Sequence, residues 1–167
     1  MKVTSTIAGQ QVTRPLSISK HPLAARWRTM FSRCYGKKRP SNEIYNTRNI
    51  TICAEWHDFE TFVNDVGLPP SDKPHLDRIN GDKGYSPDNC RWASYMQNSA
   101  NRRGHFNNIK YKGVQLTSSG RFKASIGAAG KPQYIGVFNT AEEAAIEYNK
   151  IATEWWGQFA LLNKVDK

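Results

Sequence analysis

The residues best suited to chemistry are gathered in residues 75–92, HLDRINGDKGYSPDNCRW, which combine three aspartates with a histidine, two asparagines and two arginines. Asp77 stands near the start of this segment, and Asn98 follows 21 residues later. Carboxylate and amide oxygens are hard donors that suit Mg²⁺ or a similar divalent ion, with water and a substrate phosphate completing the coordination. The pair therefore predicts a site for one divalent metal ion, Mg²⁺ or alternatively Mn²⁺, suited to phosphodiester hydrolysis.

Four nearby residues offer the other groups that such hydrolysis requires. Arg78 could clamp the phosphate or stabilise the charge that develops on it. His75 shares a strand face with Asp77 by the period-two rule, and it is the histidine best placed to act as general base. Tyr85, expected at the loop apex, could approach the phosphate. Asn89 is expected to bond the loop backbone and hold the hairpin closed.

A plainer interpretation of the same segment is a polar turn with a solvated face. Asp82 and Asp88 fit this interpretation, and His75 fits either one. Asp77 and Asn98 taken together favour the metal site.

The local hydrophobic pattern predicts the elements that must position these groups. PHLDRI and NCRWA are typical of two short strands joined by a turn-rich loop. Ser94 with Gln97 three residues later forms a capping box, which predicts a helix over about 95–103. A strand–strand–helix arrangement of this kind brings positions such as Asp77 and Asn98 face to face.

Two further helices are predicted upstream. Apolar residues spaced at i, i+3, i+4 and i+7 predict a helix over about 22–35, and a shorter helix is predicted over about 57–66. GLPP ends the second helix. Residues 1–20 are expected to form a flexible N-terminal tail.

A different pattern follows a predicted linker at residues 105–110. Residues 111–163 contain three half-alternating segments separated by Ser/Gly and Gly/Pro turns, and then a capping box at Thr140 and Glu143 that opens an amphipathic helix. The pattern predicts a three-stranded antiparallel sheet packed on one helix. With the hairpin and its helix upstream, the fold class is α+β.

The charges are segregated along the chain. The net charge is +10, yet residues 51–88 hold eight of the fourteen acidic residues, and residues 89–141 hold eight basic residues and no acidic one. An acidic segment followed by a long basic one is the pattern of an active site beside a polyanion, and nucleic acid is the expected partner. The alternative is basicity for solubility alone.

Three scattered cysteines, Cys34, Cys53 and Cys90, argue against a disulfide framework and suit a reducing cytosol. We interpret them as small buried side chains; a zinc site with His57 is the alternative. No segment has the length of a membrane span or the apolar core of a signal peptide. A cytoplasmic protein is therefore expected.

The segment LDRINGDKGYSPDNCRWASYMQNSANRR resembles the HNH nuclease motif with its ββα-metal fold, in the variant of phage-encoded and mobile endonucleases where Asp-Arg replaces Asp-His. Upstream, WRTMFSRCYG and ICAEWHDFETFVND also look like these proteins, so the resemblance covers about residues 21–103. It implies that Asp77 and Asn98 bind the metal ion and that Asn89 is the middle asparagine of the motif. Because Arg78 stands where the usual general-base histidine would be, the base would be His75, Tyr85 or a metal-bound water.

Residues 111–163 resemble the plant APETALA/ethylene-response-factor DNA-binding domain, through YKGV, the GRF turn, YIGVF, NTAEEAAIEYN and ALLN. That family lays a three-stranded sheet in the major groove and packs its helix behind it. Gln115, Thr117 and Gly127 replace arginines of the plant pattern, so its preference for GC-rich sites is not carried over. The residues expected to contact DNA, by this match and by the basic run before it, are Arg102, Arg103, Lys110, Lys112, Gln115, Arg121, Lys123, Ser125 and Tyr134.

The sequence therefore predicts a metal-dependent HNH endonuclease over residues 21–104, anchored on double-stranded DNA by a second domain over 111–163. The main alternative is a non-catalytic, sequence-specific DNA-binding or regulatory protein that keeps a degenerate HNH hairpin. A weaker alternative is an RNA-binding protein or a nuclease of structured RNA. A monomer would nick one strand, and a homodimer could cut both. A bacterial host cell is the expected location, with the protein encoded by a phage or mobile element, and homing, packaging and host-DNA attack are open as roles.

Overall fold

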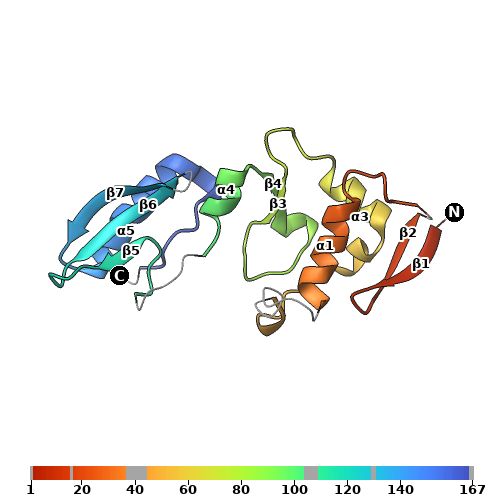
Figure 1. Ribbon diagram of the computed structural model, residues 1–167, viewed down its shortest axis with the longest axis horizontal. Coiled ribbons are helices and arrows are strands. Elements are labelled where there is room, and N and C mark those ends of the chain that lie inside the picture. Colours follow the sequence, from red (N-terminus) through yellow and green to blue (C-terminus); the bar gives the residue numbers. More distant parts are fainter. Residues whose placement is uncertain (1, 16, 37–44, 104–108, 129–130, 166–167) are drawn as a thin grey trace. The chain divides into compact units, whose positions relative to one another are not determined.

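The computed structural model describes residues 2–15, 17–36, 45–103, 109–128 and 131–165. The chain forms two compact units, Met1–Ala93 and Ser94–Lys167 (Figure 1). Each unit combines helices with antiparallel strands, which confirms the α+β class. In the part of the chain that the structure describes, no helix is both long and apolar enough to span a membrane.

The first unit opens with a β-hairpin, and the flexible tail expected over residues 1–20 is a wrong prediction. β1 (Lys2–Ile7) pairs antiparallel with β2 (Gln10–Pro15). The two turn residues, Ala8 and Gly9, have positive φ angles of 50° and 84°. Such turns match the twist of paired strands. KVTSTI alternates, but three of its polar residues, Thr4, Ser5 and Thr6, are small or β-branched, so the apolar contrast that marks a strand is weak.

This hairpin is held by contacts with residues far along the chain. Val12 is buried in the first hydrophobic core. Thr13 forms an isolated parallel bridge with Asp58, and the Lys2 ammonium pairs with the Asp58 carboxylate at 3.1 Å. The hairpin is thus an integral part of the first unit.

The first core is built around two helices. α1 (Ala24–Tyr35) buries the apolar stripe predicted from its spacing. α3 (Phe59–Val66) follows a short 3₁₀ segment, η1 (Ala54–His57), and is capped by the Asp58 side chain, which accepts the Thr61 backbone N–H at 2.9 Å. The largest fully buried side chains of this core are Trp27, Trp56, Phe31 and Phe62.

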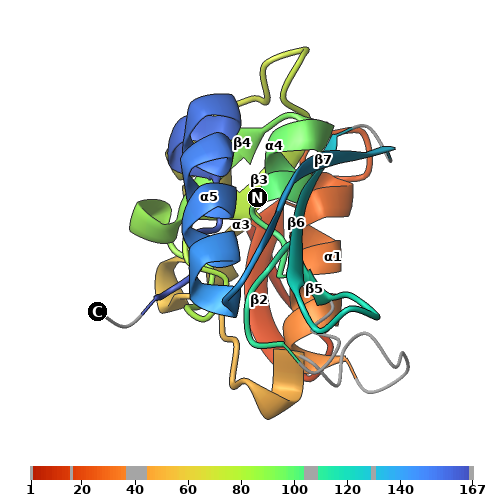
Figure 2. The same ribbon diagram turned by 90° about the vertical axis from the view of Figure 1, so that its left-hand side faces the viewer.

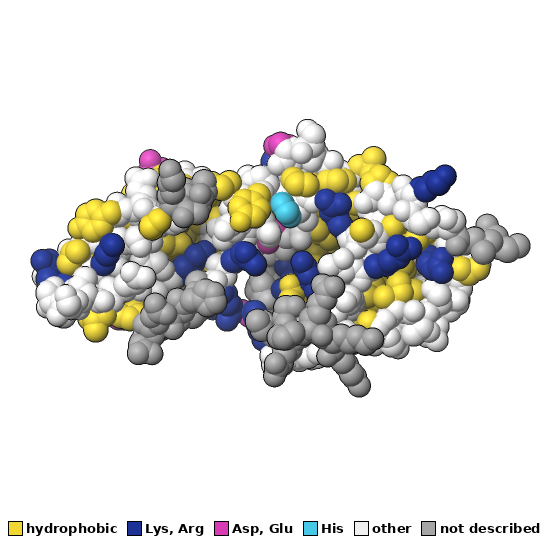
Figure 3. All heavy atoms as spheres, in the orientation of Figure 1, with side chains coloured by type: hydrophobic (Ala, Val, Ile, Leu, Met, Phe, Trp, Pro, Cys, Tyr) yellow, Lys and Arg dark blue, Asp and Glu magenta, His cyan; other side chains and the backbone are white. Residues whose placement is uncertain are grey.

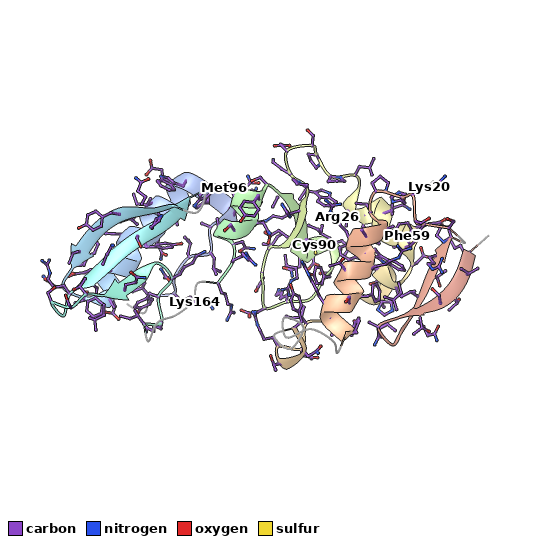
Figure 4. The ribbon with its side chains drawn as sticks, in the orientation of Figure 1. Lys20, Arg26, Phe59, Cys90, Met96 and Lys164 are labelled. Atoms are coloured by element: carbon purple, nitrogen blue, oxygen red, sulfur yellow. The ribbon has the colours of Figure 1, made fainter. Side chains whose placement is uncertain are left out.

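The predicted hairpin is present, and residues 79–89, which we call the acidic loop, join its two strands. β3 (His75–Arg78) pairs antiparallel with β4 (Cys90–Ala93), and η2 (Pro87–Asn89) precedes β4. Leu76, Cys90 and Trp92 pack against the first core, and Figure 4 shows Cys90 on the side of the hairpin toward α1. The Trp92 indole N–H also donates to the Val66 carbonyl at 2.6 Å, which fixes the hairpin to the end of α3.

The second unit contains the predicted three-stranded sheet and its helix. The strands are ordered β5-β6-β7, and α5 lies along one face of the sheet (Figure 2). Val114, Ala124 and Ile126 are buried on that face, against α5 residues that include Ala144 and Tyr148. The bounds are β5 (Val114–Leu116), β6 (Phe122–Ala128), β7 (Lys131–Phe138), α5 (Ala141–Trp156) and η3 (Gly157–Phe159).

The helix after the hairpin, α4 (Tyr95–Ala100), is shorter than the predicted 95–103 and belongs to the second unit. Its capping box of Ser94 and Gln97 is confirmed, as is that of Thr140 and Glu143 on α5. The units divide between Ala93 and Ser94, whereas the sequence led us to expect a linker at 105–110. Residues 105–108 of that linker lie outside the described residues.

Candidate active site and nucleic-acid interface

Asp77 is a buried carboxylate on the hairpin, with 7% of its surface exposed. In the β3–β4 register it lies directly opposite Arg91, whose Nε donates to the Asp77 Oδ2 at 3.2 Å. Both side chains are largely withdrawn from water, so the pair interacts more strongly than a surface ion pair would. The negative charge of the predicted metal ligand is therefore balanced by an arginine.

His75 shares the strand face of Asp77, as the period-two rule predicts. The register places His75 opposite Ala93 and Asp77 opposite Arg91. Leu76 and Trp92 alternate with these residues and pack into the first core. His75 and Asp77 therefore project from the side of the hairpin that does not face that core.

Arg78 lies on the other face of β3, between two tyrosines. Its guanidinium carbon stands 5.0 Å from the ring centroids of both Tyr45 and Tyr85, and its Nη1 donates to the Lys83 carbonyl at 2.8 Å. Cation–π contacts and a carbonyl acceptor hold the guanidinium over the acidic loop. In this arrangement Arg78 binds the loop that follows it.

Tyr85 does not lie at an exposed loop apex, as the sequence led us to expect. It is 4% exposed, and its backbone pairs with Thr51 and Cys53 at 2.8 and 2.9 Å. Burial raises the pKa of the Tyr85 hydroxyl, with a smaller contribution from neighbouring Tyr45, and the cations Arg78 and Arg33 do not cancel the effect. A phenol whose pKa is raised gives up its proton less readily, which disfavours Tyr85 as a general base.

Asn89 holds the acidic loop closed, as predicted. Its Oδ1 accepts the Asn80 backbone N–H at 2.9 Å, and its Nδ2 donates to the carbonyls of Asn80 and Gly84 at 3.2 and 2.7 Å. Asn89 is 4% exposed, so these bonds satisfy a buried amide. Its role in this structure is to shape the loop.

Two other residues set the path of the loop. A Cβ placed on Gly84 would stand 2.4 Å from the Thr51 carbonyl oxygen, so this close approach requires glycine. Arg48 forms an ion pair with Asp82 and donates to the Gly81 carbonyl at 3.1 Å. Asp82 therefore serves the loop, in agreement with the plainer interpretation of that residue.

Asn98 lies in α4, half-buried, with its backbone N–H donating to the Ser94 carbonyl at 2.9 Å. It belongs to the second unit, while Asp77 belongs to the first, so their juxtaposition stays a prediction. Within the described residues no three His, Cys, Asp or Glu side chains form a group that could hold a metal ion. The donor types of Asp77 and Asn98 still fit a hard divalent ion, since both carry oxygen donors.

The cysteines are buried or half-buried thiols. Burial raises the pKa of Cys34 and of Cys90 to about 12 and also raises that of Cys53. Thiols in this state are poor nucleophiles. This supports their interpretation as packing residues.

The outer face of the second unit's sheet carries several of the residues predicted to contact DNA. The register pairs Gln115 with Lys123, and Ser125 with Tyr134, on the face turned away from α5. Tyr134 is 61% exposed. Arg121 is exposed beside the start of β6 and donates to the Val137 carbonyl at 3.3 Å. Lys and Arg side chains are visible on the surface of both units in Figure 3.

The basic residues before the sheet divide into two kinds. Arg102, Arg103 and Lys110 are exposed. Lys112 is not part of the outer sheet face, because its ammonium donates to the carbonyl of Ala100 at the end of α4. Burial lowers the pKa of Lys112 to about 8. The prediction that Lys112 faces DNA is therefore corrected: its charged end is directed to a helix terminus.

Sequence reasoning missed four residues that shape this region. Pairing the two predicted strands would have placed Arg91 opposite Asp77, so that signal was available. Arg33, Arg48 and Tyr45 come from segments remote in sequence, and no local pattern marks them. Burial would lower the pKa of Arg33, but its interactions with Tyr85 and Tyr45 raise it overall, so Arg33 links α1 electrostatically to Tyr85 of the acidic loop.

Comparison with known proteins gives one informative match. The chain is 38% identical over 101 residues to a protein of Acanthamoeba polyphaga mimivirus named an uncharacterized HNH endonuclease. The alignment covers 60% of this chain and 52% of the viral protein, so the chain spans about half the length of that curated relative. No family model and no solved structure matches the chain. The similarity supports a relationship to HNH endonucleases.

Proposed function

We propose that this chain is a metal-dependent endonuclease of the HNH type that hydrolyses phosphodiester bonds in double-stranded DNA. The observation that carries the proposal is the β3–β4 hairpin, with a buried Asp77 on its outward side and a loop closed by Asn89. The resemblance of residues 75–103 to the HNH motif and the similarity to a viral protein of that name support it.

Asp77 and Asn98 are the residues that would hold the metal ion. A bound Mg²⁺ or Mn²⁺ would supply positive charge to a non-bridging phosphate oxygen and to the leaving 3′ oxygen. Asp77 contributes a carboxylate oxygen, and Asn98 contributes an amide oxygen. Arg91 orients the Asp77 carboxylate through its Nε–H donor at 3.2 Å.

His75 is the general base that we favour among the protein's own side chains. It lies on the Asp77 face of β3, where it can take a proton from a water that attacks in line. Tyr85 is disfavoured because burial raises its pKa. Arg78 acts by fixing the acidic loop, since its guanidinium is held over the Tyr45 and Tyr85 rings.

The second unit would anchor the enzyme on the duplex. Its outer sheet face presents an amide, a lysine, a hydroxyl and an exposed tyrosine in two adjacent rows: Gln115 and Lys123, then Ser125 and Tyr134. Lysines contact phosphates more readily than they read bases, whereas a glutamine can bond adenine with two hydrogen bonds. We therefore assign recognition of DNA bases to Gln115 and contact with the DNA phosphates to Lys123.

A second candidate is a DNA-binding or regulatory protein without nuclease activity. This candidate is favoured because the side chains predicted to be catalytic already make contacts that stabilise the fold. Asp77 pairs with Arg91, Arg78 bonds the Lys83 carbonyl, and Tyr85 is buried. In that case the hairpin would serve the fold alone.

Incubating the protein with supercoiled plasmid, linear duplex, single-stranded DNA and structured RNA tests the proposal. Mg²⁺, Mn²⁺ and a chelator would be compared at fixed salt concentration. The proposal predicts that nicked or linear plasmid appears with Mg²⁺ or Mn²⁺, that chelation abolishes it, and that RNA is spared. Tight plasmid binding with no cleavage in any ion would favour the DNA-binding protein instead.

A further inference from the structure

The helix that carries Asn98 is too short to be stable by itself. α4 has six residues and contains no fully buried side chain. Isolated helices shorter than about 12 residues are marginal in water, so α4 depends on tertiary contacts. Since Asn98 lies within it, those contacts decide how the side chain is presented.

The contacts at the end of α4 come from the second unit. The carbonyl of Ala100, the last residue of the helix, accepts both the Lys112 ammonium and the Leu161 backbone N–H. Carbonyls at a helix C-terminus lack partners within the helix, and a cation there is also favoured by the helix dipole. Lys112, two residues before β5, thus caps the end of α4.

Lys112 is itself fixed by a chain of hydrogen bonds that leads to α5. The Asn163 side chain accepts the Lys112 backbone N–H at 2.6 Å and donates to the Lys112 carbonyl at 3.0 Å. Asn149 on α5 holds the Asn163 backbone in the same way, at 2.8 and 2.9 Å. Each asparagine bonds both the backbone N–H and the carbonyl of the next residue in this hydrogen-bonded series. A continuous chain of hydrogen bonds therefore connects α5 to α4 through Asn149, Asn163 and Lys112.

The backbone after Lys112 is equally constrained. Gly113 has a φ of +76°, and a Cβ there would stand 2.3 Å from the Tyr148 ring and 2.6 Å from the Ser125 carbonyl oxygen. Only glycine fits this approach to α5 and β6. The direction in which Lys112 leaves the sheet is therefore determined by the packing of the second unit.

We propose that Lys112 and Asn163 are positioning residues for the nuclease. They attach α4, the helix that carries Asn98, to the sheet assigned above to DNA binding. This inference rests on the function proposed above. It makes the C-terminal unit part of the active site's construction, because DNA binding and the orientation of one metal ligand are then carried by a single compact unit. Residues 21–104 alone would then lack a correctly held α4.

The experiment compares full-length wild type with Lys112→Met and Asn163→Ala, and uses Lys164→Met as the matched control. Lys164 is exposed and neighbours Asn163. Four quantities would be measured: the single-turnover nicking rate, the Mn²⁺ concentration for half-maximal nicking, the Kd for plasmid-length duplex, and amide hydrogen exchange in the peptide over residues 94–103.

The positioning role predicts a nicking rate about ten-fold lower and a raised Mn²⁺ midpoint in both variants, as is usual when residues that orient metal ligands are removed. The Kd for DNA should stay within about two-fold of wild type, because Lys112 does not contact phosphate. Exchange in residues 94–103 should rise while exchange in β6 is unchanged. Lys164→Met should match wild type in all four measurements.

Two results would overturn the inference. The first is a wild-type nicking rate and Mn²⁺ midpoint in both variants. The second is a Lys112→Met variant that binds DNA weakly, with its salt dependence reduced by about one charge, because that identifies Lys112 as a phosphate contact. If wild type fails to nick the plasmid with every divalent ion tested, the proposed function fails. In that case, unchanged hydrogen exchange over residues 94–103 in both variants would show that the Lys112 and Asn163 contacts do not fix α4.

Discussion

Asp77 and Arg91 face each other across the β3–β4 hairpin, with the Arg91 Nε 3.2 Å from the Asp77 Oδ2. The carboxylate predicted to bind a metal ion is therefore already paired with a cation. A divalent ion bound to Asp77 would share the carboxylate with Arg91 or balance its negative charge in place of Arg91. The stability of this charged pair should consequently depend on the metal.

Replacing Arg91 by methionine should reduce the free energy of unfolding by about 3 kcal/mol, because it removes the cation that balances the buried Asp77 carboxylate. Mg²⁺ or Mn²⁺ should restore part of this loss if the ion binds Asp77. Urea denaturation with and without the ion measures both effects. The double variant Asp77→Asn with Arg91→Met should be less destabilised than Arg91→Met alone and insensitive to the ion. Equal destabilisation of the single and double variants, with or without metal, would contradict the assignment of Asp77 as a metal ligand.

Gly84→Ala should destabilise the protein by about 2 kcal/mol, since the new Cβ would stand 2.4 Å from the Thr51 carbonyl oxygen. Gly81→Ala is the matched control in the same loop, because no atom lies within 4 Å of its Cβ position. Thermal or urea unfolding of the two variants separates a steric effect from a general sensitivity of the loop. Similar stability of both variants would show that the loop does not approach Thr51 closely.

The sequence predicted most of the periodic elements and the residues that close the acidic loop. α1, α3, α5 and the sheet of the second unit show clear apolar periodicity, and the two capping boxes mark helix starts by local chemistry. Asn89 was predicted correctly because its loop is closed by residues nearby in sequence. These features are local, and local patterns are what a sequence displays directly.

The missed features depend on contacts between distant residues. Tyr85 is buried because segment 51–53 pairs with its backbone, and Lys112 turns from the sheet because Ala100 offers a helix-terminal carbonyl. The hairpin over residues 2–15 is stable through Thr13 and Lys2 contacts with Asp58. No spacing rule within any one of these segments indicates its remote partner.

Asp58→Ala should cost about 1 kcal/mol at pH 7, because Asp58 caps α3. Burial alone would raise the pKa of Asp58, but the Thr61 backbone N–H and Lys2 lower it overall. A carboxyl with a lowered folded-state pKa stabilises the protein above its unfolded pKa of about 3.9, and this is lost as the pH falls through the folded value. The difference between wild type and Asp58→Ala should therefore shrink below pH 4.

Urea denaturation at pH 7, 5 and 3 tests this pH dependence. Asp72→Ala, at an exposed turn, is the control and should differ little from wild type at any of these pH values. A difference between wild type and Asp58→Ala that persists unchanged at pH 3 would show that the stabilisation does not come from the ionised carboxylate.

Lys123→Ala and Gln115→Ala should affect DNA binding in different ways. Loss of a phosphate contact at Lys123 should weaken binding to all duplexes and reduce the salt dependence by about one charge. Loss of Gln115 should weaken binding to preferred sequences by about 1–3 kcal/mol and leave non-specific binding unchanged. Fluorescence anisotropy at several salt concentrations, on a selected and a random duplex, distinguishes the two. If neither variant changes DNA binding, the outer sheet face is not the DNA-binding surface.

The most direct test of the account is the nicking of supercoiled plasmid by wild type, Asp77→Ala and Asn98→Ala, with plasmid binding measured on the same samples. Asp88→Ala serves as control because Asp88 is exposed, on η2. Wild type and Asp88→Ala should nick the plasmid with Mg²⁺ or Mn²⁺. Asp77→Ala and Asn98→Ala should not nick it, although both should bind the plasmid as wild type does. Nicking that persists in either of these two variants would contradict the metal site.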